Sequence, residues 1–270
     1  MNNLVIYCKS YRTDLALVTR LHESIQKYNI DDIPFYISCP ETDLDLFRNA
    51  LGTDTNIITD ESILNNKINQ SWHSQQVVKL SFWKTNLTKN YLCIDSDSEF
   101  IKEFKISDFI YNGDIPYTVC HEQKELLEWS TKFPNLYTHI YNGYSGDRLQ
   151  IMKFFNRKGK LYDFGPSPVI FNASVLKSLQ DKYMTPNNLT YNQLIYFCPS
   201  EFSWYGEWLL YDKTIPIYPS EALFKVFHYK EQYDDYLTTG YTLENLKLNY
   251  LGIVRSEEHT SELQSRGLIS

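Results

Sequence analysis

The sequence has 270 residues, of which 43% are hydrophobic and 22% charged, the proportions of an ordinary globular protein. Its formal net charge is -7 and it has no block of Lys and Arg residues, which argues against nucleic acid as a partner because phosphate backbones are bound by clustered basic side chains. The five cysteines are scattered without a CxxC pair, so neither a disulfide framework nor a zinc site is indicated, and free thiols fit a reducing compartment. Because no signal-peptide pattern and no apolar stretch of membrane-spanning length occur, we expect a cytoplasmic protein without a transmembrane segment.

The first half of the chain alternates predicted strands with predicted helices. Short apolar runs predict strands at residues 4–8, 34–39, 56–59 and 91–94. Helices are expected after Asp14, where apolar residues keep helical spacing, and at residues 44–51 and 74–88. This alternation predicts an α/β fold with a mostly parallel sheet flanked by helices.

The second half is less regular. Strands or extended segments are expected at residues 116–120, 168–171, 215–218 and 223–229, and helices at residues 173–182 and 188–196. No linker rich in Gly, Ser or Pro separates the two halves, so we expect a single domain over residues 1–254. Residues 255–265 read RSEEHTSELQS and resemble a translated sequencing adapter. Residues 255–270 are therefore interpreted as a non-native tail that is expected to be disordered.

The segment Asp95-Ser96-Asp97 directly follows the predicted strand 91–94. In open parallel sheets, ligands bind beyond the carboxyl ends of the strands. Magnesium and manganese prefer oxygen ligands and are commonly held by one or two carboxylates together with substrate phosphates. The D-x-D pattern therefore predicts that Asp95 and Asp97 bind a divalent cation at the sheet edge.

Other interpretations of the D-x-D pattern were weighed. A calcium-binding EF-hand loop needs Gly at its sixth position and Glu at its twelfth, but Phe100 and Ile106 stand there. Phosphohydrolases of the haloacid dehalogenase type also place D-x-D after a strand, although they do so near the start of the chain. That reading, with Asp95 as the nucleophile, stays open, as does a solvated turn.

The helix before this strand carries Gln75, Gln76 and Lys79 on one face, because their spacings are three and four residues. From Lys79 the helix rises by about 13 Å at about 1.5 Å per residue, and the following strand returns by about the same distance to Asp95. Lys79 is therefore expected level with Asp95, where an ammonium suits a phosphate. A solvent-facing lysine is the alternative.

The first predicted strand is also followed by polar residues at its carboxyl end. These residues are Ser10, Tyr11, Arg12 and Asp14. An aromatic ring can stack on a nucleobase, and an arginine pairs with phosphate or carboxylate.

Three segments together are similar to a known family. KSYRTDL, SQQVVKL and YLCIDSDSEFI resemble a GT-A-type family of glycosyltransferase-like proteins of unknown function from bacteria and large-genome viruses. The segment EFSWYG, which begins at Glu201, resembles the E-Y-x-L-Y-G segment of that family, with Phe202 and Trp204 in place of the usual Tyr and Leu.

The resemblance implies a GT-A-like fold and a nucleotide-sugar donor, UDP- or GDP-linked, held through Mn²⁺ or Mg²⁺. Asp95 and Asp97 are the implied metal ligands, and a late histidine, His228, matches a third ligand, although a packed strand histidine is the equal alternative. The implied donor-binding residues are Ser10, Tyr11, Arg12, Asp14, Gln75, Gln76, Lys79, Asp95 and Ser96. Glu201 is a candidate for the base that takes the proton from a hydroxyl acceptor, and a carboxylate favoured at a helix N-terminus is its alternative.

The expected function is therefore a metal-dependent glycosyltransferase of the hexosyltransferase type that acts in glycan assembly, with Asp97 and Glu201 as catalytic residues. Two rivals remain, namely a phosphohydrolase and a non-catalytic protein that binds nucleotide sugars. The sequence does not indicate the donor sugar, the acceptor or the stereochemical course.

Overall fold

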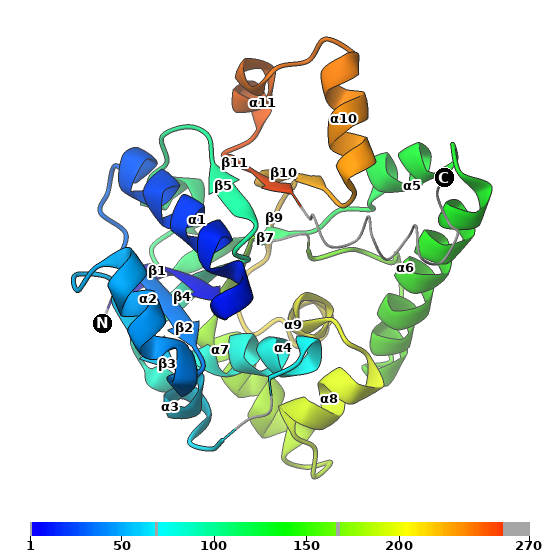
Figure 1. The fold of residues 1–270 in the computed structure, drawn as a ribbon. Helices are drawn as coiled ribbons and strands as arrows, with labels where there is room; N and C mark the ends of the chain where they lie inside the picture. Colours follow the sequence, from blue (N-terminus) through cyan, green and yellow to red (C-terminus); the bar gives the residue numbers. More distant parts are fainter. Residues whose placement is uncertain (1, 68–69, 166–167, 256–270) are drawn as a thin grey trace.

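A five-stranded sheet forms the centre of the computed structural model, which describes residues 2–67, 70–165 and 168–255 (Figure 1). The order of its strands is β3-β2-β1-β4-β8. Their bounds are β1 (Asn2–Lys9), β2 (Phe35–Cys39), β3 (Asn56–Thr59), β4 (Thr88–Ile94) and β8 (Val169–Asn172). The first four strands run parallel and β8 is antiparallel to β4. The prediction of a mostly parallel sheet is confirmed.

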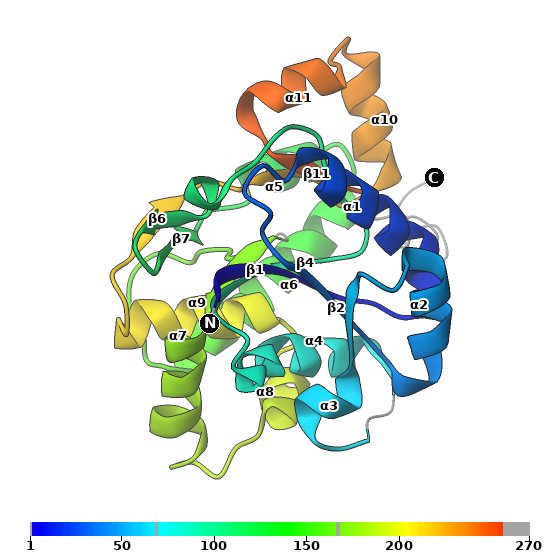
Figure 2. The same ribbon diagram turned by 90° about the vertical axis from the view of Figure 1, so that its left-hand side faces the viewer.

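Helices cover both faces of this sheet. Successive side chains of β1 point to opposite faces, so each strand contributes apolar side chains to two cores. Leu4, Ile6 and Cys8 pack with α1 (Leu15–Tyr28) and α2 (Leu44–Leu51) in one core. Val5 and Tyr7 belong to a second core on the other face. The helices of that second core are α4 (Trp72–Ser81), α7 (Ala173–Ser178), α8 (Tyr191–Phe197) and α9 (Glu201–Asp212). Figure 2 shows β1 between the two groups of helices.

Two small sheets complete the strands. In the first, the order is β10-β11-β5, with β5 (Ser98–Phe100), β10 (Phe224–Phe227) and β11 (Gly252–Arg255). The second has the order β6-β7-β9, with β6 (Ile110–Asn112), β7 (Ile115–Val119) and β9 (Tyr218–Ser220). Arg255, the first residue of the adapter-like segment, is the last residue of β11, and the rest of that segment lies outside the described residues.

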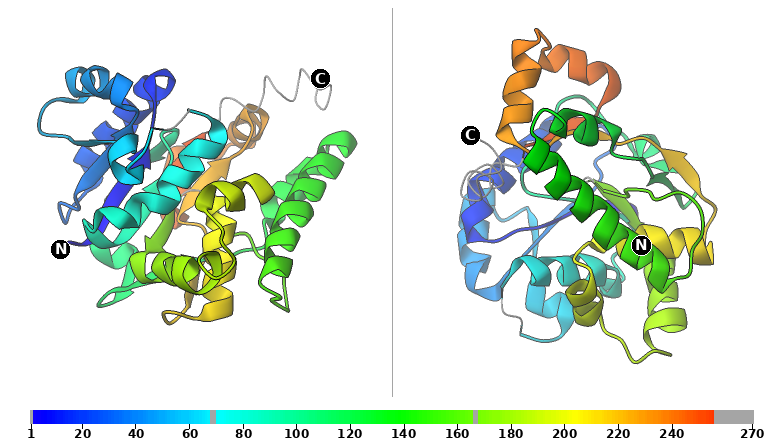
Figure 3. Two further views of the ribbon diagram at one scale, coloured as in Figure 1. Left: turned by 90° about the horizontal axis from the view of Figure 1, so that it is seen from below. Right: turned by 90° about the vertical axis from the view of Figure 1, so that its right-hand side faces the viewer.

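Five further helices belong to the described part of the chain, and Ile63 and Ile151 from two of them also lie in the second core. These helices are α3 (Asp60–Leu64), α5 (Lys124–Ser130), α6 (Pro134–Phe154), α10 (Lys230–Thr238) and α11 (Leu243–Asn249). Short helical turns are η1 (Arg12–Asp14), η2 (Glu41–Asp43), η3 (Phe82–Thr85), η4 (Ile106–Asp108) and the π-helical η5 (Leu179–Met184). Figure 3 shows α6 at the side of the molecule opposite α2. Within the described ranges, no helix has both the length and the apolar character that crossing a membrane requires.

Some boundaries differ from the sequence-based expectations. The helix predicted at residues 74–88 ends at Ser81 and continues as the tighter turn η3, because β4 already begins at Thr88. Of the extended segment predicted at residues 215–218, only Tyr218 belongs to a strand. The long helix α6 was not predicted, because its segment is rich in Tyr, Asn and Gly, which are weaker helix formers than Ala or Leu.

Candidate functional site

A buried lysine lies between two carboxylates at the carboxyl edge of the central sheet. Asp95 directly follows β4, Lys79 comes from α4, and Glu201 is the first residue of α9. Lys79 Nζ lies 2.5 Å from Asp95 Oδ1 and 2.8 Å from Glu201 Oε1. The Lys79 side chain is 5% exposed and that of Glu201 8%. The structure thus places Lys79 beside Asp95, as the lengths of the helix and the strand predicted.

The surroundings of Lys79 keep its ammonium charged and its backbone fixed. Burial acts to lower the pKa of Lys79, but Asp95 and Glu201 outweigh burial and hold that pKa well above its usual value. The ring of Phe202 lies 5.3 Å from Nζ, within the range of a cation–π contact. The Tyr91 hydroxyl donates a hydrogen bond of 2.8 Å to the Lys79 carbonyl, so the helical turn that carries the lysine is tied to β4.

Asp97 supplies a second carboxylate with an unusual environment. Its Oδ1 atom is buried and accepts no hydrogen bond. Burial, and then the neighbouring Asp95, raise the pKa of Asp97 to about 7. A buried oxygen without a partner costs free energy, which a bound cation would offset. Because Mg²⁺ and Mn²⁺ prefer carboxylate oxygens, the Asp95 and Asp97 pair fits such a cation.

The loops after β1 and β4 meet through two of the predicted donor-binding residues. The Ser96 Oγ atom donates a hydrogen bond of 3.1 Å to Asp14 Oδ2, and Asp14 ends the turn η1. Asp14 therefore joins Asp95, Asp97, Glu201 and Lys79 in one group of charged residues, which we call the acidic site. Three of its carboxylates follow β1 or β4 at the same edge of the sheet.

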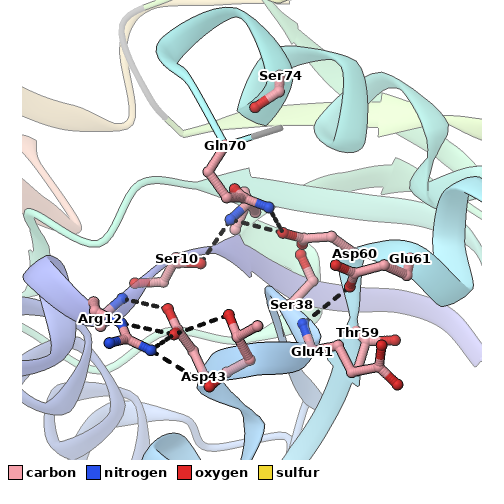
Figure 4. A network of polar contacts seen from close by, with 12 residues as sticks. Ser10, Arg12, Ser38, Glu41, Asp43, Thr59, Asp60, Glu61, Gln70 and Ser74 are labelled. Atoms are coloured by element: carbon pink, nitrogen blue, oxygen red, sulfur yellow. Dashed lines mark hydrogen bonds and ion pairs between the residues drawn. The ribbon is translucent and has the colours of Figure 1, made fainter. Parts of the chain in front are cut away.

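A second polar network lies at the carboxyl ends of β1, β2 and β3 (Figure 4). Its centre is an ion pair of 3.0 Å between Lys9 Nζ and Asp60 Oδ2, both with fully buried side chains. Lys9 Nζ also donates to the Ser10 carbonyl at 2.7 Å, and Gln70 Nε2 donates to Asp60 Oδ2 at 3.3 Å. Burial raises the pKa of Asp60, and Lys9 opposes that shift. Asp60 Oδ1 and Ser10 Oγ are buried without a hydrogen-bond partner.

The sequence analysis did not predict the ion pair between Lys9 and Asp60. It also did not predict the contact between Glu201 and Lys79. A signal existed for Lys9 and Asp60, because each is a charged residue that directly follows a strand of the parallel sheet or ends it. The contact between Glu201 and Lys79 joins residues 122 positions apart and carried no local signal.

Arg12 and Tyr11 occupy the rim of this network. The backbone N–H of Arg12 donates to Asp43 Oδ2 at 2.9 Å, and its Nε atom donates to Asp43 Oδ1 at 2.8 Å. Arg12 outweighs the effect of burial and lowers the pKa of Asp43. The ring of Tyr11 is half-buried and lies 5.6 Å from Lys9 Nζ. The structure therefore engages Arg12 with Asp43 and sets Tyr11 against the buried network.

The two predicted glutamines differ in their environment. Gln76 is buried, its Nε2 donates to the Trp72 carbonyl at 3.4 Å, and its Oε1 atom has no hydrogen-bond partner. Gln75 is half-buried and lies one helical turn before Lys79.

His228 lies apart from the aspartate pair. It follows β10, and its backbone N–H donates to Gln232 Oε1 at 2.7 Å. Within residues 2–67, 70–165 and 168–255, no three His, Cys, Asp or Glu side chains are grouped so that they could hold a metal ion, so the structure does not bring His228 to Asp95 and Asp97. The strand β11 lies between β10, which His228 follows, and β5, which Asp97 precedes.

His228 lines a cavity of about 790 Å³ between α5, α10 and the strand β10. Its walls carry six aromatic side chains, namely Trp129, Tyr162, Phe224, Phe227, Tyr236 and Tyr250. They also carry four carboxylates, namely Glu122, Glu125, Glu221 and Asp235. Lysines neutralise three of these, since Glu122 pairs with Lys160, Glu125 with Lys225 and Asp235 with Lys132. The cavity is therefore polar and aromatic with little net charge.

The fold and this site define an α/β protein with a lysine-centred acidic site at the carboxyl edge of a mostly parallel sheet. Residues 4–242 match the model of a family of unknown function (DUF6492), and the chain belongs to that family. No curated protein matches the chain. Every residue of the acidic site lies inside the matched range.

Proposed function

We propose that the protein is a metal-dependent glycosyltransferase that moves a sugar from a UDP- or GDP-linked donor to a hydroxyl acceptor in glycan assembly. The observation that carries the proposal is the position of Asp95 and Asp97, which follow β4 at the ligand-binding edge of the sheet with a buried lysine beside them. Carboxylates, a cation between them and an ammonium form a set of groups suited to a diphosphate. Family membership alone does not supply this function.

The chain offers separate places for the parts of the donor. The cation would be held by Asp95 and Asp97. The buried Oδ1 atom of Asp97 accepts no hydrogen bond, and this is the observation that most favours a cation there. Lys79 is the nearest cationic group for the diphosphate oxygens. The half-buried ring of Tyr11, next to the Lys9–Asp60 network, supplies a flat surface for a nucleobase.

We assign to the cavity behind β10 the part of the acceptor that lies away from the reacting hydroxyl, because no residue of the acidic site lines this cavity. Its volume of about 790 Å³ lies within the usual range for small-molecule sites. Aromatic faces together with carboxylate and amide groups suit a molecule rich in hydroxyl groups. His228 at its wall would then contact the acceptor or its neighbour, which is a different role from the metal ligand expected at first.

Catalysis in this proposal depends on charge stabilisation. When bound, the divalent cation neutralises negative charge that develops on the departing nucleoside diphosphate. Lys79 donates hydrogen bonds to the same group, and its burial strengthens that interaction. Glu201 is bonded to Lys79, so it can accept the acceptor's proton only after the ammonium has moved away. Its role as a base stays a prediction.

The proposal is tested by measuring the release of UDP or GDP from a panel of nucleotide sugars in the presence of Mn²⁺. We expect release with at least one donor, and a loss of at least about 100-fold for Asp97→Ala, since a charge-stabilising group is removed. The exposed Asp54, which lies in a turn, provides a matched control as Asp54→Ala. Full activity of a folded Asp97→Ala protein would overturn the assignment, and donor binding without release would favour the non-catalytic alternative.

One observation favours a phosphohydrolase, namely the direct contact of a lysine with the first aspartate of the D-x-D pattern. In that mechanism Asp95 attacks a phosphoryl group and becomes an aspartyl phosphate. Trapping with radiolabelled phosphate donors and Mg²⁺ separates the two functions, because the glycosyltransferase reaction forms no phosphorylated aspartate.

A further inference from the structure

We propose that Lys79 blocks the cation site of the ligand-free protein by holding Asp95, and that a nucleoside diphosphate opens the site by taking over the ammonium. Cation and nucleotide would then bind together, each weakly without the other. This inference rests on the proposed function, because it concerns the cation and the diphosphate of that reaction. It assigns Lys79 a second role beside its contact with the diphosphate, namely control of access to the cation site, and it assigns Glu201 a role as the second anchor of the Lys79 ammonium.

The geometry places the ammonium where it competes with a cation. Lys79 Nζ lies 2.5 Å from Asp95 Oδ1, so it contacts one of the two carboxylates that would hold the ion. A divalent ion bound to Asp95 would face this ammonium at a short distance, and like charges in a water-poor site repel strongly. The cation can therefore bind well only after the ammonium has withdrawn from Asp95.

The surroundings of Lys79 allow that withdrawal without a change of the fold. Its backbone is fixed by α4 and by the hydrogen bond from Tyr91 to its carbonyl. Its side chain is a flexible chain of four carbons. A second carboxylate, Glu201, lies 2.8 Å from its ammonium. The ammonium can thus leave Asp95 while Glu201 still compensates its charge.

A diphosphate supplies what the displaced ammonium then needs. Among the described residues of the acidic site, Asp14, Asp95, Asp97 and Glu201 are anionic and Lys79 is the single cation. With its four carboxylates ionised, the site has a net charge of about -3, so a divalent ion reduces this charge and a diphosphate alone increases it. A divalent ion and a doubly or triply charged diphosphate bound together change it little. The two ligands are therefore expected to increase each other's affinity, by the same factor in each direction.

The test compares wild-type protein with Lys79→Met/Glu201→Gln. This double variant has the same net charge as the wild type, because one cation and one anion are removed together. It also avoids leaving one buried charge unpaired, which would threaten the fold. Lys84→Met, on the turn that follows α4, is the control for loss of a lysine outside the acidic site, and the Lys84 side chain is exposed. Free Mn²⁺ is measured by electron paramagnetic resonance during titration, alone and with UDP or GDP, and thermal melting confirms that each variant is folded.

Without nucleotide, we expect the double variant to bind Mn²⁺ at least about tenfold more tightly than the wild type, since Asp95 is released while the net charge is unchanged. With UDP or GDP, the affinity of the wild type and of Lys84→Met should rise by at least about tenfold, and that of the double variant much less. These readouts do not depend on catalysis.

Equal Mn²⁺ affinity of the wild type and the double variant in the absence of nucleotide would overturn the inference and leave the cation site, and with it the proposed function, intact. Absence of Mn²⁺ binding in every variant, with and without either nucleotide, would overturn both. A nucleotide effect of the same size in the wild type and the double variant would also contradict the role of Lys79.

Discussion

Asp97→Asn should stabilise the metal-free protein at high pH and have little effect near pH 4. The carboxyl group of Asp97 has a pKa of about 7 in the folded protein, against 3.8 for an unperturbed aspartate. Because the folded state holds the proton more tightly, ionisation costs stability, and this cost grows as the pH rises from about 4 to about 7. At about 1.4 kcal/mol for each unit of pKa, the full cost is about 4 kcal/mol above pH 7. Asparagine carries no charge at any pH and removes that cost.

Urea denaturation in the presence of EDTA, at several pH values between 5 and 8, measures this effect. The free energy of unfolding of Asp97→Asn should exceed that of the wild type by a margin that increases with pH. The exposed Asp54→Asn variant provides the control and should follow the wild type throughout. Two results would contradict the raised pKa of Asp97. One is a lower free energy of unfolding for Asp97→Asn than for the wild type at pH 8, and the other is a difference between the two proteins that does not change with pH.

Three further changes test the packing around the site by urea or thermal denaturation. Lys79→Met alone should lower the free energy of unfolding by about 3–5 kcal/mol, because Glu201 stays buried without its partner. Adding Glu201→Gln should restore most of that loss. A loss below about 1 kcal/mol for Lys79→Met would contradict the buried pair. Gly206→Ala should cost about 1–3 kcal/mol although alanine favours helices, since a Cβ atom there would lie 2.0 Å from the Phe164 ring, and a neutral result would mean that this ring can move aside. Leu209→Ala, on the buried side of α9, should lower the free energy of unfolding by about 2–5 kcal/mol. A smaller loss would indicate that the surrounding side chains move into the space that the leucine leaves.

The parts of the fold that could be predicted from the sequence are those with regular local patterns. The parallel strands are short apolar runs, and Asp95 directly follows one of them, so its place at the sheet edge followed from the pattern. The position of Lys79 beside it followed from the lengths of one helix and one strand, which are nearly constant from protein to protein.

The parts that could not be predicted depend on contacts between distant segments. A helix beginning at Glu201 was only the alternative interpretation of that residue. The extent of α9 was not predicted because most of its residues are buried, which removes the amphipathic pattern that marks a surface helix. Without α9, nothing in the sequence placed Glu201 next to Lys79. His228 was matched to a metal ligand through resemblance alone, and the insertion of β11 beside β10 could not be seen from the local sequence.

The position of β11 has a practical consequence for any shortened version of the chain. This last described strand pairs with β10 on one side and with β5 on the other, and β5 begins one residue after Asp97. A protein cut at residue 242, where the family match ends, would lose the strand that joins these two neighbours and would leave both with open hydrogen-bonding edges. The segment with Asp95 and Asp97 would then precede a strand, β5, that has lost its partner β11. Mapping of the minimal active fragment should therefore find its C-terminal limit beyond the family boundary.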